Sequence, residues 1–362
     1  MKVLLIAGAR PNFMKIAPIY RASLEHVSVE CKIVHTGQHY DYEMSEAFFV
    51  DLGIPKPDYS LDAGSGSHAV QTAKIMVAFE DVCIKEKPDL VMVVGDVNST
   101  LACSIVAKKL LIDVAHVEAG LRSFDPSMPE EINRIVTDAI SDYFFVTEES
   151  GVENLIREGK PRERIHFVGH VMIDNLYYQV RKLEDDHTEK FSVFELKQAH
   201  EKYAFLTLHR PSNVDNKETF TEIAGALNAI AETRPIFFPM HPRTKKMADR
   251  FGIAFSERII TLPPLSFQES LFLWKDAEVV LTDSGGLQEE TTALGVPCVT
   301  IRENTERPIT VEVGTNILAG TNGESIASSY IESIEKARSA KKPTLWDGLA
   351  SVRLWSYLCQ GR

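Results

Sequence analysis

Acidic side chains occur at three places that suit proton transfer. Asp96 follows the apolar residues 90–94, Glu118 follows the apolar residues 114–117, and Glu130 lies at the expected start of a helix. Carboxylates gathered in a closed site are candidates for acid–base work, because burial and mutual repulsion raise the pKa of at least one of them. A metal site is the alternative, but no histidine stands at ligand spacing from them, so we predict no metal.

Taken one at a time, these acids also have structural explanations. Asp96 suits a helix N-cap, and a carboxylate in the first turn of a helix interacts favourably with its dipole, which accounts for Glu130 or Glu131. Three carboxylates are nevertheless expected at one edge of the same sheet. That gathering favours a chemical role.

Cationic and imidazole side chains form a second group, suited to an anionic ligand. Arg10 and Lys15 lie at the start of the first expected helix, whose free N–H groups also attract anions. His209 and Arg210 follow one later apolar segment, and His241 follows the next. Histidine can also donate or accept a proton there. An ordinary turn with solvated cations is the alternative for Arg10 and Lys15, because the segment has neither a GxGxxG nor a Walker pattern.

Residues 282–290 (TDSGGLQEE) give the sharpest indication of a ligand. Ser284, Gly285 and Gly286 stand between an expected strand and an expected helix, where backbone N–H groups can approach a phosphate closely. Glu290 lies about one turn into that helix, placed to accept hydrogen bonds from ribose hydroxyls.

Two side chains outside this segment extend the nucleotide hypothesis. Phe267 belongs to a loop that could present an apolar edge to a base, and Arg307 adds a cation. A nucleoside diphosphate fits the whole set better than a free phosphate.

Short apolar segments alternate with stretches long enough for helices, which predicts βαβ units and parallel sheets. One series comprises residues 2–7, 31–35, 90–94, 114–117, 143–146 and 165–168, and a second comprises 204–208, 236–239, 259–262, 279–282 and 298–300. We therefore predict an α/β protein of two Rossmann-like, doubly wound domains facing a cleft. Ligands of such sheets bind beyond the carboxyl ends of the strands. The expected division is an N-terminal domain of residues 1–174, a linker of 175–202 and a C-terminal domain of 203–345.

Composition excludes several other classes of protein. The 362 residues are 44% hydrophobic and 25% charged, with a net charge of −12 and no long basic block, so a nucleic-acid or membrane surface is not expected. No apolar stretch is long enough to span a bilayer, and the first residues do not resemble a secretory leader. The five scattered cysteines form no CxxC pair, which predicts a reducing, cytoplasmic setting without disulfides.

The motifs occur together in an order that is similar to the non-hydrolysing UDP-N-acetylglucosamine 2-epimerases. They are GARPNFMK, GDVNST, HVEAGLRS, MPEEINR, LHRPSN, DSGGLQEE and RENTERP, and they extend from the first strand to about residue 315. The resemblance implies the two-domain GT-B fold, with a C-terminal helix of about residues 346–362 packing back on the first domain. It implies a homodimer that interconverts UDP-GlcNAc and UDP-ManNAc for surface polysaccharide synthesis, with neither a cofactor nor a metal.

The resemblance also assigns roles to individual residues. The acidic catalytic positions correspond to Asp96, Glu118 and Glu130, and the catalytic-pocket histidine corresponds to His209. Substrate-binding positions correspond to Arg10, Lys15, Arg210, His241, Phe267, Ser284, Gly285, Gly286, Glu290 and Arg307. The sequence does not separate the base, the acid and the supporting group among the three carboxylates.

The chain departs from the family pattern at a few positions. Ala9 and Asn12 replace residues of the common GTRPE turn, and Pro211 stands where many members have a second arginine. Some bacterial members bind a second UDP-GlcNAc as an activator near a QH motif and a helical arginine; this chain has Gln38-His39 but Lys74 at the arginine's place. A related UDP-sugar, such as a 2,3-diacetamido uronate, and a catalytically silent nucleotide-sugar binder stay open as alternatives.

Overall fold

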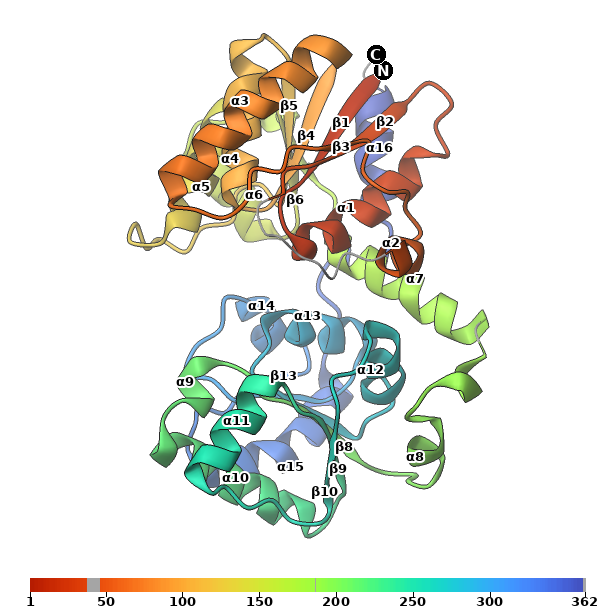
Figure 1. The fold of residues 1–362 in the computed structure, drawn as a ribbon, viewed down its shortest axis with the longest axis vertical. Helices are drawn as coiled ribbons and strands as arrows, with labels where there is room; N and C mark the ends of the chain where they lie inside the picture. Colours follow the sequence, from red (N-terminus) through yellow and green to blue (C-terminus); the bar gives the residue numbers. More distant parts are fainter. Residues whose placement is uncertain (38–45, 186, 361–362) are drawn as a thin grey trace. The chain divides into compact units, whose positions relative to one another are not determined.

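A computed structural model describes residues 1–37, 46–185 and 187–360 (Figure 1). Its internal contacts divide the chain into two compact units. The N-terminal unit comprises Met1–Leu176 and the segment from Thr344 onward, and the C-terminal unit comprises Tyr177–Pro343. The boundary between them falls inside helix α7 (Val171–Asp185).

The N-terminal unit is built on a parallel sheet of seven strands in the order β3-β2-β1-β4-β5-β6-β7. The strands are β1 (Lys2–Ala7), β2 (Glu30–His35), β3 (Tyr59–Ser60), β4 (Leu90–Val94), β5 (Asp113–Val117), β6 (Tyr143–Val146) and β7 (Ile165–Phe167). All five residues of β4 are buried, as expected for a strand covered on both faces.

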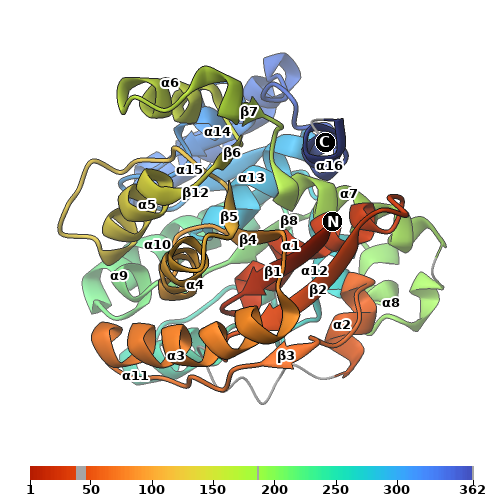
Figure 2. The same ribbon diagram turned by 90° about the horizontal axis from the view of Figure 1, so that it is seen from above.

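Helices cover both faces of this sheet. They are α1 (Arg10–Ser23), α2 (Glu46–Leu52), α3 (His68–Glu86), α4 (Asn98–Lys109), α5 (Pro129–Ile140), α6 (Glu149–Arg157) and α16 (Ala350–Gln360), with a 3-10 turn at Arg162–Arg164. Figure 2 shows α3, α4 and α5 on one face and α1 and α16 on the other. The buried side chains agree, because Leu4 and Ile6 pack with α3 and α4, whereas Val3 and Leu5 pack with α1 and α16.

The C-terminal unit repeats the same topology with six parallel strands in the order β10-β9-β8-β11-β12-β13. The strands are β8 (Ala204–Thr207), β9 (Ile236–Pro239), β10 (Ile259–Leu262), β11 (Val279–Thr282), β12 (Cys298–Thr300) and β13 (Asn316–Leu318).

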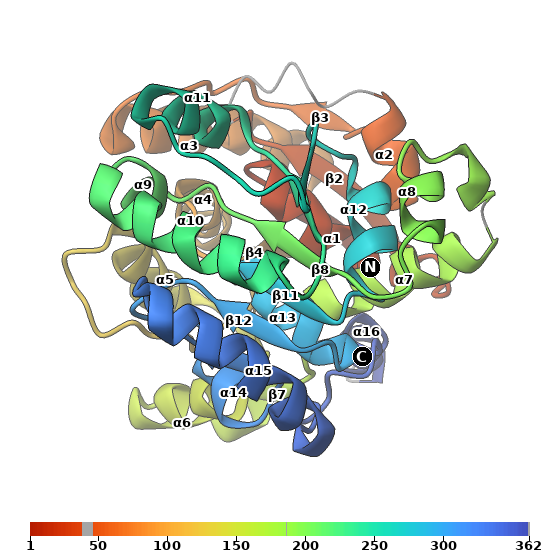
Figure 3. The same cartoon turned by 90° about the horizontal axis from the view of Figure 1, so that it is seen from below.

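The helices of this unit again follow the strands. They are α8 (Phe194–Gln198), α9 (Pro211–Val214), α10 (Lys217–Ala231), α11 (Pro242–Phe251), α12 (Phe267–Trp274), α13 (Gly285–Leu294), α14 (Pro308–Glu312) and α15 (Gly323–Ser339), with a 3-10 turn at Thr188–Lys190. Figure 3 shows α10 and α15 lying side by side. Both pack on the sheet in one apolar core together with α11.

The two parallel sheets confirm the predicted α/β class, and every predicted strand is present. Two edge strands, β3 and β13, were not predicted, because two or three residues leave no clear apolar run. The first helix begins at Arg10, since Pro11 is well suited to a first helical turn. All five cysteines are free thiols.

Candidate functional site

Strand order concentrates the predicted site residues of the N-terminal unit. The order reverses between β1 and β4, and loops at such a switch point leave a crevice for a ligand. Helix α1, with Arg10 and Lys15, starts after β1, and Asp96 follows β4. Glu118 follows β5, the next strand along the sheet.

Glu118 has the most constrained environment of the predicted acids. It is 7% exposed, and its backbone adopts a left-handed conformation with φ of 70°, which costs a non-glycine residue about 1–3 kcal/mol. Oε2 accepts a hydrogen bond of 2.6 Å from Nζ of Lys15. The other oxygen, Oε1, is buried and has no hydrogen-bond partner within the part of the chain that the structure describes. A buried carboxylate oxygen in that state is available to a ligand.

Gly95 shows how closely the backbone approaches this pair. Its φ is +71°, and a side-chain Cβ there would lie 3.3 Å from Nζ of Lys15 and 3.5 Å from Oε2 of Glu118. Glycine therefore keeps the turn after β4 from displacing the pair.

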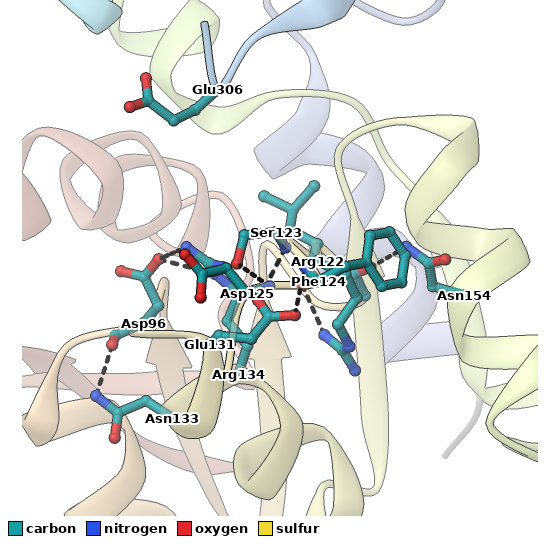
Figure 4. Close-up of polar contacts among 12 residues, drawn as sticks. Asp96, Arg122, Ser123, Phe124, Asp125, Glu131, Asn133, Arg134, Asn154 and Glu306 are labelled. Atoms are coloured by element: carbon teal, nitrogen blue, oxygen red, sulfur yellow. Dashed lines mark hydrogen bonds and ion pairs between the residues drawn. The ribbon is translucent and has the colours of Figure 1, made fainter. Parts of the chain in front are cut away.

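Asp96 is held by an arginine that the sequence analysis did not single out. Arg134 donates to Oδ2 of Asp96 through Nε at 3.0 Å and Nη2 at 2.7 Å, as Figure 4 shows. The same guanidinium donates to Glu131 through Nη1 at 2.7 Å. Glu131 and Arg134 are three residues apart on α5, and residues at that spacing share a helix face, so the sequence does indicate their ion pair.

Glu131 and Glu130 are adjacent on α5 but differ in surroundings. Glu131 is buried and accepts hydrogen bonds from the backbone N–H groups of Ser123 and Phe124, so it organises that loop (Figure 4). Burial raises the pKa of Glu131, but these donors and Arg134 outweigh it and the net pKa is lowered. Glu130, the predicted catalytic residue of the two, is half-buried at the second position of the helix.

Arg10 lies at the exposed start of α1, with its guanidinium carbon 5.2 Å from the ring centroid of Phe48. Lys74 lies exposed on α3. Gln38 and His39 lie outside the described residues, so the structure does not address the activator motif.

The C-terminal unit reverses its strand order between β8 and β11, and His209 and Arg210 follow β8. They meet Asp283, a fully buried carboxylate after β11. Its Oδ2 accepts from the backbone N–H groups of His209 at 2.9 Å and Arg210 at 2.7 Å. Its Oδ1 lies 2.9 Å from Nδ1 of His209, which leaves Nε2 as the ring nitrogen for a contact with a ligand.

Asp283 belongs to the 282–290 segment, and its position next to Ser284 gives no sign of a partner 74 residues away. Burial raises its pKa, but the His209 contact and the two backbone donors outweigh burial, so the net pKa is lowered. It is therefore an ionised group that orients His209.

Helix α13 begins directly after this carboxylate. Ser284 is its N-cap residue, and Gly285 and Gly286 are its first two helical positions. A Cβ placed on either glycine would meet no atom within 4 Å, so the start of the helix borders open space. The free N–H groups of its first turn face that region of the unit without a capping side chain.

Glu290 lies further along α13 in a dry environment. Burial raises its pKa to about 8, and the neighbouring carboxylate of Glu289 adds to the rise. Glu289 in turn pairs with Nε of Arg307 at 2.6 Å, so the predicted anion-binding arginine contacts a carboxylate in this structure.

His241 and Phe267 occupy helix starts. Nδ1 of His241 accepts from the N–H of Arg243 and caps α11, and its ring centroid is 6.2 Å from that of His209. Phe267 is the first residue of α12 and is half-buried.

The structure thus brings together two sets of predicted residues, each at the switch point of its own sheet. Lys15, Asp96 and Glu118 form the first, and His209, Arg210 and the start of α13 form the second. The described residues contain no group of three or more histidine, cysteine or carboxylate side chains arranged to hold a metal. No helix among them is long and apolar enough to cross a membrane.

Comparison with known proteins gives consistent matches. The sequence model of the family described as UDP-N-acetylglucosamine 2-epimerase matches residues 22–359. A UDP-N-acetylglucosamine 2-epimerase of Methanocaldococcus jannaschii is 44% identical over 368 residues and covers 100% of both chains. A UDP-2,3-diacetamido-2,3-dideoxy-D-glucuronate 2-epimerase of Pseudomonas aeruginosa is 40% identical and covers 99% of this chain and 100% of its own.

A solved structure agrees with the sequence matches. The crystal structure of the M. jannaschii UDP-GlcNAc 2-epimerase in complex with UDP-GlcNAc and UDP superposes with a TM-score of 0.83 at 44% identity over 100% of both chains. The chain therefore has a close structural counterpart along its whole length.

Proposed function

The chain belongs to the UDP-N-acetylglucosamine 2-epimerase family, and on this premise we propose that it interconverts UDP-GlcNAc and UDP-ManNAc by inverting C2 of the sugar. The observation that carries the proposal is Glu118, a buried carboxylate with one oxygen on Lys15 and the other without a hydrogen-bond partner in the described chain. Such a group can take a proton from a bound substrate.

The chemistry explains why the site needs acids and a phosphate cradle together. C2 of the pyranose has no adjacent carbonyl, so direct proton removal would leave an unstabilised carbanion. In the proposed elimination, a carboxylate takes the C2 proton while the C1–O bond breaks. UDP leaves with that electron pair, and a C1=C2 double bond forms as 2-acetamidoglucal. Return of a proton to the opposite face of C2, with attack of the diphosphate oxygen on C1, completes the inversion.

The two units divide these tasks in the proposal. Asp96, Glu118 and Glu130 of the N-terminal unit act on the sugar, with Lys15 holding Glu118 in place. In the C-terminal unit, the start of α13 binds the diphosphate, because free N–H groups at a helix start stabilise the departing negative charge. Glu290 binds the ribose, and His209 contacts the reacting part of the substrate.

Five further residues complete the proposed site. Arg10, Arg210, His241, Phe267 and Arg307 are proposed as further substrate contacts. We also propose that the protein is a cytoplasmic homodimer that uses no metal or cofactor. Its product serves as a precursor of surface polysaccharides. The domain boundaries are proposed to lie close to residues 174 and 203.

Proton NMR of the purified protein with UDP-GlcNAc in D2O, with EDTA and no added cofactor, tests the proposal. We expect a growing UDP-ManNAc anomeric signal with deuterium at C2, and slow release of UDP and 2-acetamidoglucal. Retention of protium at C2 in the epimerised product would exclude proton removal at that carbon.

A second substrate has specific support from the P. aeruginosa relative, which is named for a 2,3-diacetamido glucuronate. The same NMR assay with that UDP-sugar separates the two. An unchanged UDP-GlcNAc spectrum with turnover of the uronate would identify the second substrate, and UDP binding without turnover of either would indicate a silent binder.

A further inference from the structure

His116 lies on β5, two residues before Glu118, and the function proposed above gives it no role. Both of its ring nitrogens face oxygen atoms. Nδ1 is 2.6 Å from Oδ1 of Asp138, and Nε2 is 2.9 Å from the carbonyl oxygen of Gly95. The His116 ring and the Asp138 carboxylate are 0% exposed, so water does not compete for either contact.

This geometry determines how many protons the ring carries. A neutral imidazole has one N–H, so its unprotonated nitrogen would direct a lone pair at one of the two oxygens. Asp138 does not supply the missing proton, because its Oδ2 accepts from the N–H of Gly120 at 3.0 Å and lies 2.7 Å from Nη2 of Arg122. Those donors keep the carboxylate ionised, and the ring therefore donates at both ends.

We propose that His116 is a buried imidazolium ion held by Asp138, and that this ion positions the carboxylates of Asp96 and Glu118 for the reaction. His116 is thus a positioning residue, and its effect on turnover rests on the proposed function.

The hydrogen bonds of His116 and Asp138 reach the two loops that carry Asp96 and Glu118. The Gly95 carbonyl precedes Asp96, and the Gly120 N–H follows Glu118, so each segment is tied to the Asp138–His116 pair. Glu118 lies between these two tied positions and has a left-handed backbone, with φ of 70°. A non-glycine residue keeps such a conformation where the surrounding structure enforces it, and the pair fixes the backbone two residues after Glu118.

The charges around the ring favour its ionised form. Burial lowers the pKa of His116, but the Asp138 carboxylate, the Gly95 carbonyl and the Glu118 carboxylate outweigh burial, so the net pKa is raised. The remaining charges nearby are paired. Arg122 contacts Asp138 and also Glu158, which directly follows α6, and Lys15 of α1 contacts Glu118.

The charge state can be read without measuring activity. In the full-length protein labelled with 15N-histidine, we expect both ring nitrogens of His116 to carry protons at pH 7, above the ordinary histidine pKa of about 6.5. The His116→Gln variant assigns the signal. A ring with a single N–H at pH 7 would overturn the proposal, whatever the enzyme does.

Asp138→Asn tests the positioning role, because it keeps the shape of the side chain but removes its charge. We expect kcat to fall by about tenfold to a hundredfold, since small displacements of catalytic groups have effects of that size, with KM little changed. Asp138 is the largest influence that raises the pKa of the ring, so without this carboxylate the ring loses its charge at a lower pH than in wild type, and the loss of kcat grows as pH rises. A wild-type kcat and pH profile in this variant would contradict the positioning role.

Glu158→Gln is the matched control. It alters the exposed end of the same network, leaves the Asp138–His116 contact in place, and is expected to keep wild-type kcat. Absence of turnover by the wild-type protein would count against the proposed function, and the NMR measurement would still decide the charge on His116.

Discussion

At the scale of single residues, the candidate site depends on carboxylates whose surroundings differ sharply. Glu118 is buried against Lys15, Asp96 is held by Arg134, Asp283 is ionised by several donors, and Glu290 lies in a dry region with a raised pKa. The lowered pKa of Asp283 and the raised pKa of Glu290 give these two carboxylates of the C-terminal unit different charges near neutral pH, so they can serve different tasks.

Glu118→Gln removes the proposed proton-transfer group while keeping its shape and an oxygen that can accept from Lys15. We expect turnover to fall by roughly two powers of ten or more, with UDP affinity retained, because the start of α13 is untouched. Turnover by NMR and UDP binding by calorimetry measure the two effects. Glu153→Gln, an exposed acid on α6, is the control, and near-normal turnover of Glu118→Gln would refute its role.

Glu290 links stability to pH in a direction that can be worked out. Its folded-state pKa is about 8 against an ordinary value of 4.5, so the folded protein holds the proton more tightly than the unfolded chain. Stability is therefore lost as pH rises from about 4.5 to about 8.

Glu290→Gln abolishes this titration. We expect the variant to gain unfolding free energy over wild type at pH 8 by at least about 1 kcal/mol, with little difference at pH 4.5, and to bind UDP more weakly. Denaturant unfolding at both pH values measures the gain. Equal stability of the two proteins at pH 8 would show that Glu290 is already charged in the folded state.

At the scale of elements, loops after parallel strands place these residues, and helix starts supply bare N–H groups. Helix α13 is the example with most consequence, since Gly285 and Gly286 border open space directly after the ionised Asp283. Neither glycine has a left-handed backbone, so backbone conformation does not require glycine here, and the proposed diphosphate site supplies a reason for it.

Gly285→Val places a branched side chain in that open space. We expect folding stability to stay close to wild type, because a Cβ at this position meets no atom within 4 Å, while UDP affinity falls by at least about tenfold. Calorimetry with UDP measures the affinity. Gly225→Val on α10, whose Cβ would also meet no atom within 4 Å, should bind UDP normally, and normal binding by Gly285→Val would place the diphosphate elsewhere.

At the scale of the whole molecule, the chain returns to complete its first unit. Helix α16 joins the core of the N-terminal unit, where Trp355 is fully buried and its Nε1 donates to the carbonyl oxygen of Ile19 on α1 at 2.8 Å. The N-terminal end of α16 is fixed as well, because the N–H groups of Ala350 and Ser351 donate to Asp174.

Trp355→Ala should destabilise the N-terminal unit by about 3–5 kcal/mol, through lost apolar burial and a lost hydrogen bond. Hydrogen exchange of α1 and β1 amides measures this locally, which matters because two units need not unfold together. Val352→Ala, at an exposed position of the same helix, should change stability by less than about 0.5 kcal/mol. Wild-type protection of α1 in Trp355→Ala would show that α16 is dispensable to the core.

The sequence by itself determined the α/β class and every strand except the short edge strands β3 and β13, because strands buried on both faces are continuous apolar runs that can be read locally. It also located Asp96, Glu118, His209 and the start of α13, since loops at strand ends carry polar residues there. The family followed from the order of seven short motifs, and the matches to known proteins confirm it.

Tertiary structure decided which partners these residues have. Arg134 on Asp96, Asp283 on His209 and Asp138 on His116 join residues 38, 74 and 22 positions apart, on different elements. The strand order that puts Asp96 and Glu118 in the loops after adjacent strands is likewise not determined by any local pattern. Side-chain pairing and pKa depend on distances set by packing of the whole unit, and a linear pattern of residue types does not contain those distances.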